Sequence, residues 1–305
     1  MQMMARQATA AEAVSDEESA AAPPYAERRF TAQDGLSIYY RDYGDPLSER
    51  MPVLCLPGMT RNSKDFDRLA RRLCKDRRVI CPDYRGRGQS DRDPDWRRYR
   101  PETDLSDIRH LLAVAGIGRV FVVGTSMGGL LAAGMAVAMP SMIAGALVND
   151  VGPRIAADGL GNIVRYLSKT EPHDSWDDAV ASMLKSFPNL PVYADGDLMA
   201  IVQATFRVGD DGRIHADWDP ALVKPLIAGH HKSYDFMALF RALARLPGIA
   251  LRGALSDVLD AATFREMGSM LPRFRQIVLP GVGHAPSLGE PAVLDALDEL
   301  LAEIR

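Results

Sequence analysis

The chain has 305 residues, of which 47% are hydrophobic and 25% charged, which is enough for one large α/β domain with an insertion or for two small domains. Its 36 Lys and Arg residues against 40 Asp and Glu give a formal net charge of −4, so no basic excess points to nucleic acid as a partner, and no apolar run reaches the roughly 18 residues that predict a membrane-spanning helix. The 3 cysteines show no metal-ligand spacing and are typical of reduced thiols, so we expect a cytoplasmic protein.

The start of the chain predicts a tail followed by a hairpin. Residues 1–24 are rich in Ala, Glu, Gln and Ser and lack the continuous apolar stretch of about 7–15 residues that a secretory signal requires. We therefore expect a mobile N-terminal tail. Residues 28–31 and 36–41, with Asp34-Gly35 between them, are predicted to be the two strands of an antiparallel hairpin.

The next two strands are each followed by a glycine-containing loop. Residues 53–56 predict a buried strand that ends in Pro57-Gly58-Met59. Gly58 allows the backbone to approach a ligand closely, and the backbone N–H of Met59 could then donate a hydrogen bond to it. Strand 78–81 leads into the polar loop 82–90. This loop lacks the lysine and the spacing of a phosphate-binding loop, so we do not expect a nucleotide.

The segment around residue 126 predicts a nucleophile. Residues 120–123 form a short apolar run that is typical of a buried parallel strand, and residues 130–139 are good helix formers. Between them lies the pattern G-x-S-x-G, as Gly124-Thr125-Ser126-Met127-Gly128. A serine at such a strand-to-helix corner exposes its hydroxyl at the end of the sheet, and the backbone N–H of Met127 could stabilise a developing oxyanion.

The regular alternation of strands and helices breaks after residue 153. Strand 143–148 ends near Asp150, which is either a substitute catalytic acid or the cap of a turn. Residues 154–234 contain helical pieces separated by Pro and Gly, with a small hairpin around Asp211-Gly212, and predict a mainly helical lid inserted between two sheet strands, hereafter the insertion. Large apolar side chains of the insertion are expected either to line a substrate pocket or to form the insertion's own core. The pocket candidates are Met183, Phe187, Met199, Phe206 and Trp218.

The core resumes in residues 235–305 with two more strands, each followed by a candidate catalytic residue. Strand 248–252 leads to Asp257, and strand 276–279 leads to His284. Because the carboxyl ends of parallel strands share one edge of a sheet, we expect Ser126, Asp257 and His284 to meet there. We assign them the roles of nucleophile, orienting acid and general base, since a serine hydroxyl needs a base to remove its proton.

With these motifs the chain resembles the α/β-hydrolase superfamily over about residues 28–304. The resemblance rests on the elbow around Ser126, on Gly253…Ser256-Asp257 and on Gly281-Val282-Gly283-His284. It implies an α/β fold with a mostly parallel sheet of about eight strands flanked by helices, in which the lid follows strand six and divides the core into residues 25–153 and 235–305. Many members have His-Gly where this chain has Pro57-Gly58, so one orienting side chain is missing.

The serine of the G-x-S-x-G pattern also distinguishes between groups of superfamily members with different activities. Members that cleave epoxides or haloalkanes use an aspartate nucleophile, and Ser126 argues against both activities. We therefore expect a serine hydrolase that cleaves a small, rather apolar carboxylic ester or lactone through an acyl-enzyme. The backbone N–H groups of Met59 and Met127 would form the oxyanion hole, and Gly58 would contact substrate. No cofactor is expected, and no metal, because the adjacent histidines at 230 and 231 have no accompanying ligand set.

Two other functions remain open at this stage. The resemblance includes carbon–carbon bond hydrolases that act on diketone ring-fission products, in which a lid arginine and tryptophan assist the triad; Arg154 or Arg207 with Trp218 could supply that pair. The second alternative is a non-catalytic protein of the same fold that binds a small ligand. The sequence fixes neither the acyl and alcohol groups of the substrate nor the oligomeric state, and a homodimer is compatible with it.

Overall fold

The structure, a computed structural model, describes residues 24–169, 171–190 and 197–304. The predicted N-terminal tail, residues 1–24, therefore lies outside the described residues apart from Pro24. Within the described ranges, no helix combines the length and the apolar character needed to cross a membrane.

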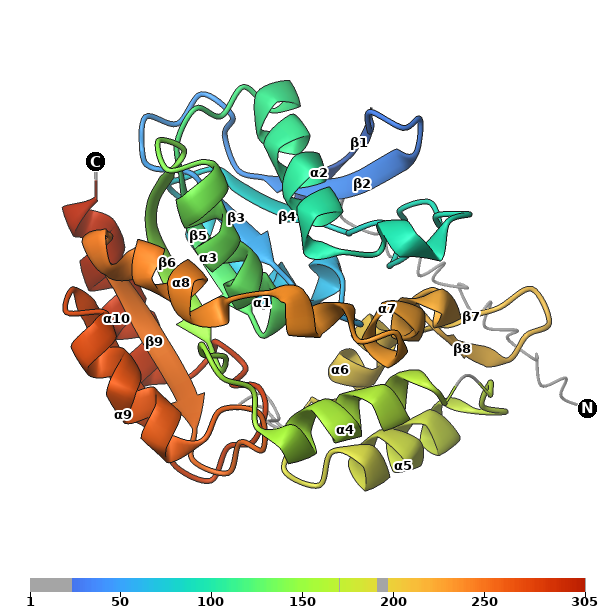
Figure 1. Ribbon diagram of the computed structural model, residues 1–305. Helices are drawn as coiled ribbons and strands as arrows, with labels where there is room; N and C mark the ends of the chain where they lie inside the picture. The colour runs from blue at the N-terminus through green and yellow to red at the C-terminus, as the bar shows by residue number, and fades with distance from the viewer. Residues whose placement is uncertain (1–23, 170, 191–196, 305) are drawn as a thin grey trace, which may run out of the picture.

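One sheet organises the described chain (Figure 1). Its strand order is β1-β2-β4-β3-β5-β6-β9-β10. The pairs β1–β2 and β2–β4 are antiparallel, and the remaining neighbours are parallel. The prediction of a mostly parallel sheet of about eight strands is confirmed. The strands are β1 (Tyr25–Thr31), β2 (Ser37–Tyr43), β3 (Val53–Leu56), β4 (Val79–Pro82), β5 (Val120–Thr125), β6 (Ile143–Asn149), β9 (Gly248–Gly253) and β10 (Phe274–Leu279).

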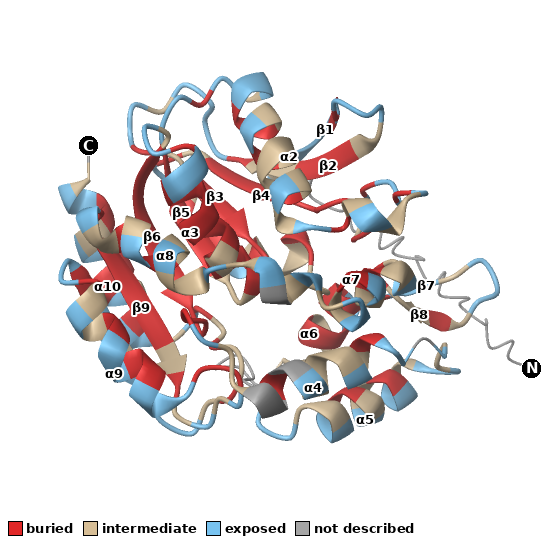
Figure 2. Ribbon diagram, in the orientation of Figure 1, coloured by how far each residue is buried: buried red, intermediate tan, exposed pale blue. Residues whose placement is uncertain are grey.

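Helices cover both faces of this sheet, because its central strands are apolar on both sides. All residues of β3 and β6 are buried, and Figure 2 shows these strands in the buried interior. One apolar cluster packs α1 (Asp67–Leu73) and α10 (Pro291–Glu303) against the sheet. The cluster on the other face contains side chains of four helices. They are α2 (Pro101–Val114), α3 (Met127–Ala138), α8 (Phe236–Ala242) and α9 (Ala261–Met270).

The insertion lies between β6 and β9 in sequence and beside the carboxyl ends of the parallel strands in space (Figure 1). Strands β7 and β8 pair antiparallel around the predicted Asp211-Gly212 turn. The buried side chains of the insertion form a third apolar cluster, separate from the two clusters of the sheet. The elements of the insertion are α4 (Ala157–Leu167), α5 (Trp176–Ser186), α6 (Leu198–Thr205), β7 (Phe206–Val208), β8 (Ile214–Ala216) and α7 (Lys224–Ile227).

A buried arginine joins three segments beside the site. Arg85, in the loop after β4, is 1% exposed. Its Nη1 atom donates to Asp34 in the β1–β2 turn at 2.8 Å and to Asp93 at 2.6 Å, and its Nε and Nη2 atoms donate to the two carboxylate oxygens of Asp107 on α2, both at 2.9 Å. Such a bidentate pair fixes orientation as well as distance. The loop after β4, the N-terminal hairpin and α2 are thereby held in one arrangement.

We predict that Arg85→Met lowers the free energy of unfolding by about 3–5 kcal/mol, because it removes the positive charge shared by several carboxylates of which Asp93 is fully buried. Guanidinium chloride denaturation measures this change. Arg97→Met is the control, since its ion pair with Asp95 is exposed, and we expect a change below about 1 kcal/mol. Equal losses in the two variants would show that the Arg85 cluster adds nothing to stability.

Candidate active site

Ser126 lies at the corner between β5 and α3. Its backbone has φ 54° and ψ −116°, a conformation that a non-glycine residue adopts only where the surroundings impose it. A Cβ atom added at Gly124 would overlap the Gly128 carbonyl oxygen, and one added at Gly128 would overlap the Leu56 carbonyl oxygen. The two glycines therefore permit close contact of α3 with β5 and β3, and this contact holds the serine hydroxyl at the end of the sheet.

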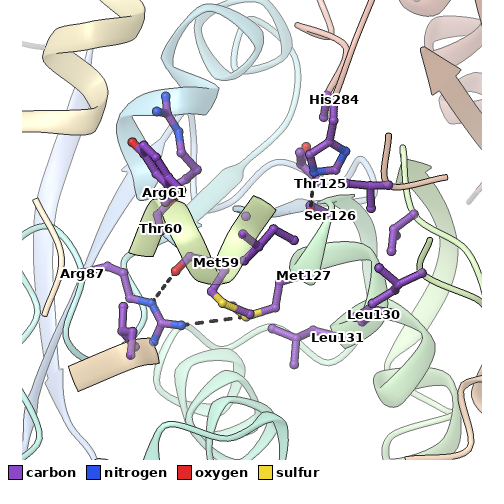
Figure 3. A pocket seen from close by; sticks show the side chains of 18 of the residues that line it. Met59, Thr60, Arg61, Arg87, Thr125, Ser126, Met127, Leu130, Leu131 and His284 are labelled. Atoms are coloured by element: carbon purple, nitrogen blue, oxygen red, sulfur yellow. Dashed lines mark hydrogen bonds between the residues drawn. The ribbon is translucent and has the colours of Figure 1, made fainter. Parts of the chain in front are cut away.

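His284, in the loop after β10, contacts Ser126 and one carboxylate. Its Nε2 atom lies 3.0 Å from Ser126 Oγ (Figure 3), and its Nδ1 atom lies 2.7 Å from Asp150 Oδ2. Asp150 directly follows β6, is 0% exposed and has φ 56°. Its other carboxylate oxygen accepts the backbone N–H of Gly253 at 2.9 Å. Ser126, His284 and Asp150 thus form a continuous chain of hydrogen-bonding contacts.

The prediction that Asp257 orients His284 is wrong. Asp257 is exposed, and its carboxylate accepts a hydrogen bond from the Asn162 amide at 2.7 Å. It comes four residues after Gly253, the last residue of β9, so the chain has already turned away from the sheet edge. Asp150, which the sequence left open as an acid or a turn cap, directly follows its strand and reaches the histidine.

Asn149 is a residue of the candidate site that the sequence reasoning missed. It is fully buried, its backbone oxygen accepts the Ser126 N–H at 2.9 Å, and its side-chain amide donates to Thr125 Oγ1 at 3.1 Å and to the Pro286 carbonyl at 2.9 Å. It therefore joins the turn between β5 and α3, which carries Ser126, to the loop after β10, which carries His284. The available signal was a polar residue at the end of an otherwise apolar strand, directly before the acid.

The histidine loop also contacts the insertion. The backbone N–H of Gly283 donates to the carbonyl oxygen of Asn189 at 3.1 Å. A Cβ atom at Gly283 would lie 2.6 Å from the same oxygen, so glycine is required for this approach. His284 is consequently held on one side by Pro286 and Asn149 of the core, and on the other by the insertion.

A cavity of about 290 Å³ opens beside Ser126 and His284. Gly58, Met183 and Phe187, three of the predicted substrate-contacting residues, line it. Met199 does not line it, and the prediction that Phe206 and Trp218 line it is wrong. Both side chains are buried in the insertion's own core, where their rings lie 6.1 Å apart between centroids.

The two residues expected to supply oxyanion donors flank the serine and share a neighbour. Met59 follows β3 and Met127 begins α3, and both line the cavity. Arg87 lies beneath them and is 3% exposed. Its Nε atom donates to the Met59 carbonyl oxygen at 2.9 Å, and its Nη2 atom lies 3.8 Å from Met127 Sδ (Figure 3). One guanidinium group therefore contacts both residues.

Asp104 is the carboxyl group that interacts electrostatically with Arg87. It is 2% exposed, and no described residue forms a hydrogen bond with its Oδ1 atom. Burial raises the pKa of Asp104 to about 6, against the opposing effect of the Arg87 charge. Burial also lowers the pKa of Arg87, although the Asp104 charge favours its protonated form. The floor of the cavity thus contains a buried pair of opposite charges.

Within the ranges that the structure covers, no group of three His, Cys, Asp or Glu side chains is placed to hold a metal ion. The ring of His230 instead stacks on Trp96, with 6.0 Å between centroids. At the sheet edge, a hydroxyl, an imidazole and a carboxylate lie in hydrogen-bonding contact, which is the arrangement needed to activate a serine.

Residues 53–297 match the model of the Alpha/beta hydrolase family. The chain belongs to this family. It is 32% identical over 260 residues to the 3-hydroxybutyrate-oligomer hydrolase of Cupriavidus necator, covering 83% of this chain and 88% of that protein. It is 23% identical over 252 residues to the 2-(acetamidomethylene)succinate hydrolase of Mesorhizobium japonicum, covering 81% and 87%. The crystal structure of an alpha/beta hydrolase from Novosphingobium aromaticivorans matches with a TM-score of 0.86 and 40% identity, covering 92% of this chain and 99% of that one.

We predict that Asp104→Asn changes how stability depends on pH. The folded wild type holds the Asp104 proton up to a pKa of about 6, whereas the ordinary value is 3.8, so the folded state binds more protons between these values. The free energy of unfolding of wild type should therefore fall relative to the variant as pH rises from about 4 to 6, by on the order of 3 kcal/mol. Urea denaturation of both proteins from pH 4 to 8 measures the difference. A constant difference over this range would contradict the raised pKa.

Proposed function

We propose that this hydrolase cleaves carboxylic esters through an acyl-enzyme, with Ser126 as nucleophile, His284 as general base and Asp150 as the acid that orients it. The observation that carries the proposal is the contact series from Asp150 through His284 to Ser126 at the edge of the cavity. With Nδ1–H donated to Asp150, Nε2 accepts the serine proton during attack and then gives it to the leaving alcohol. Water repeats the sequence on the acyl-enzyme and releases the acid.

The backbone N–H groups of Met59 and Met127 would stabilise the oxyanion of each tetrahedral intermediate. This role is supported by their positions after β3 and at the start of α3, on the cavity that contains Ser126. Arg87 supports both residues through the Met59 carbonyl and Met127 Sδ. Donors that are already held in place cost no reorganisation during reaction, and one such donor typically contributes about 100- to 1,000-fold in turnover.

The cavity supports a small, rather apolar acyl group. Its volume of about 290 Å³ suits a short acyl chain, and its lining includes the apolar side chains of Leu130, Met183 and Phe187. The likeness to the 3-hydroxybutyrate-oligomer hydrolase makes short esters of hydroxy acids the first substrates to test. Lactones require the same bond cleavage and belong to the same proposal. The chemistry uses side chains and backbone groups of this chain alone.

Carbon–carbon bond cleavage is less well supported. Arg154 forms an ion pair with Glu266, Arg207 lies 3.7 Å from Asp217, and Trp218 is buried in the core of the insertion. None of the three candidates for an assisting lid residue lines the cavity beside Ser126. The ester proposal needs no such assistance.

The first test is hydrolysis of p-nitrophenyl esters of increasing acyl length, of lactones and of 3-hydroxybutyrate dimers, by wild type and Ser126→Ala. We expect turnover by wild type and a loss of about 10⁶-fold in kcat in the variant, because the covalent route disappears. Circular dichroism checks that both proteins are folded. Turnover that persists in Ser126→Ala would refute the acyl-enzyme, and folded wild type that is inactive on every compound would redirect attention to a ligand-binding role.

A matched pair of substitutions identifies the acid. Asp150→Asn should lower kcat by about 10⁴-fold, because an amide at this position favours the wrong imidazole tautomer. Asp257→Asn should change kcat by less than about threefold, because the Asp257 carboxylate bonds to Asn162 and not to His284. The kinetics of both variants on one short p-nitrophenyl ester suffice. If Asp257→Asn is the more damaging change, the assignment of the acid is wrong.

A further inference from the structure

A second cavity, of about 330 Å³, borders His284. It lies against α4 and α5 of the insertion and against the loops after β9 and β10. His284, Tyr166 and Phe187 line both this cavity and the one that contains Ser126. The catalytic histidine therefore separates two neighbouring cavities of different chemistry.

This second cavity carries an excess of positive charge. Arg165 and Lys169 come from α4 and the residues after it, and Lys185 comes from α5. Arg165 donates to the Asn162 side-chain oxygen at 2.7 Å, and Lys169 donates to Ser186 Oγ at 3.4 Å. Within the described ranges, none of these three cations forms an ion pair with a carboxylate. We call this second cavity, with Arg165, Lys169 and Lys185, the basic cavity.

One carboxylate partly offsets this charge. Asp257 also lines the basic cavity, and its Oδ2 atom is already bonded to Asn162. Among the described lining residues, three cations against one carboxylate leave an excess of two positive charges next to His284. Charges of one sign that line a concave surface raise the local concentration of a ligand of the opposite sign.

We propose that the basic cavity binds the alcohol portion of the ester when that portion carries a carboxylate. The inference rests on the proposed ester hydrolysis and specifies its substrate class, namely an ester between an apolar acid and a hydroxy acid with a free carboxylate. A cationic alcohol portion would be repelled there. An uncharged, apolar alcohol portion would displace water from the three cationic side chains without offering them a hydrogen-bond acceptor.

Proton transfer requires the alcohol oxygen to lie next to His284, the residue that lines both cavities. When Ser126 Oγ bonds to the ester carbonyl carbon and the carbon–oxygen bond to the alcohol breaks, His284 gives the proton taken from Ser126 to the departing oxygen. The alcohol oxygen must therefore lie within reach of His284 Nε2, while the acyl chain occupies the apolar cavity. The rest of the alcohol then extends past His284 toward the basic cavity. Its carboxylate keeps its negative charge throughout, and water, which hydrolyses the acyl-enzyme, is the second reactant.

The test compares two esters of the same acid. One is 3-(butyryloxy)butanoate, whose alcohol portion carries a free carboxylate, and the other is its methyl ester at that carboxylate, which is neutral there. We define the ratio as kcat/KM for butyryl transfer from the anionic ester divided by that from the neutral ester, with both products followed by chromatography. The ratio cancels effects that are common to both substrates, such as a small change in folding or in the triad.

In Lys185→Glu and in Lys169→Glu we expect the ratio to fall by about tenfold or more relative to wild type, because each substitution replaces an attraction by a repulsion. In wild type the ratio should also fall between 0.05 and 0.5 M NaCl, since these side chains are exposed to screening. Lys75→Glu is the matched control. It makes the same change in net charge on an exposed residue outside both cavities, and its ratio should equal that of wild type.

Two negative results have different meanings. Wild type that hydrolyses the neutral ester, with a ratio that Lys185→Glu and Lys169→Glu leave unchanged or that Lys75→Glu lowers equally, would overturn the basic cavity as a binding site and leave the proposed ester hydrolysis intact. Folded wild type that hydrolyses neither ester nor any p-nitrophenyl ester would overturn the proposed function, and this inference with it.

Discussion

The buried Asn149 side chain and backbone connect the parts of the site that come from distant positions in the sequence. Its carbonyl oxygen holds the backbone of Ser126, its amide group bonds to Thr125 and to the Pro286 carbonyl of the histidine loop, and the next residue is the acid, Asp150. A buried amide that satisfies several partners is costly to disrupt, since each would be left unpaired. Asn149, at the end of β6, therefore links the backbone of Ser126 to the loop that carries His284.

The serine and the histidine could be predicted because each belongs to a local pattern. The Gly-x-Ser-x-Gly corner needs glycines where α3 meets β5 and β3, and the histidine follows the last strand in a glycine-containing loop. The acid could not be predicted in this way, because Asp150 and Asp257 both follow strands. The choice depends on the left-handed backbone of Asp150 and on the turn of the chain after Gly253, and neither has a distinctive sequence pattern.

The sheet was predictable because its apolar runs are separated by glycine, proline and charged residues. The residues that line the pocket were harder to predict from the sequence. Met183 and Phe187 line the cavity. Phe206 and Trp218, which are of similar character and from the same insertion, pack against each other, and Trp218 also packs against Tyr166. Helical or strand spacing predicts that an apolar side chain is buried, but only the packing of the insertion decides between a cavity wall and a core.

The hydrogen bond from Gly283 to Asn189 gives the three catalytic groups unequal mechanical support. Ser126 and Asp150 are fixed by hydrogen bonds within the sheet and its immediate loops, whereas the loop of His284 is attached partly to the insertion. A shift of the insertion would therefore move the base relative to a stationary nucleophile and acid. The position of the imidazole relative to Ser126 therefore depends on two separately folded parts of the chain, the sheet and the insertion.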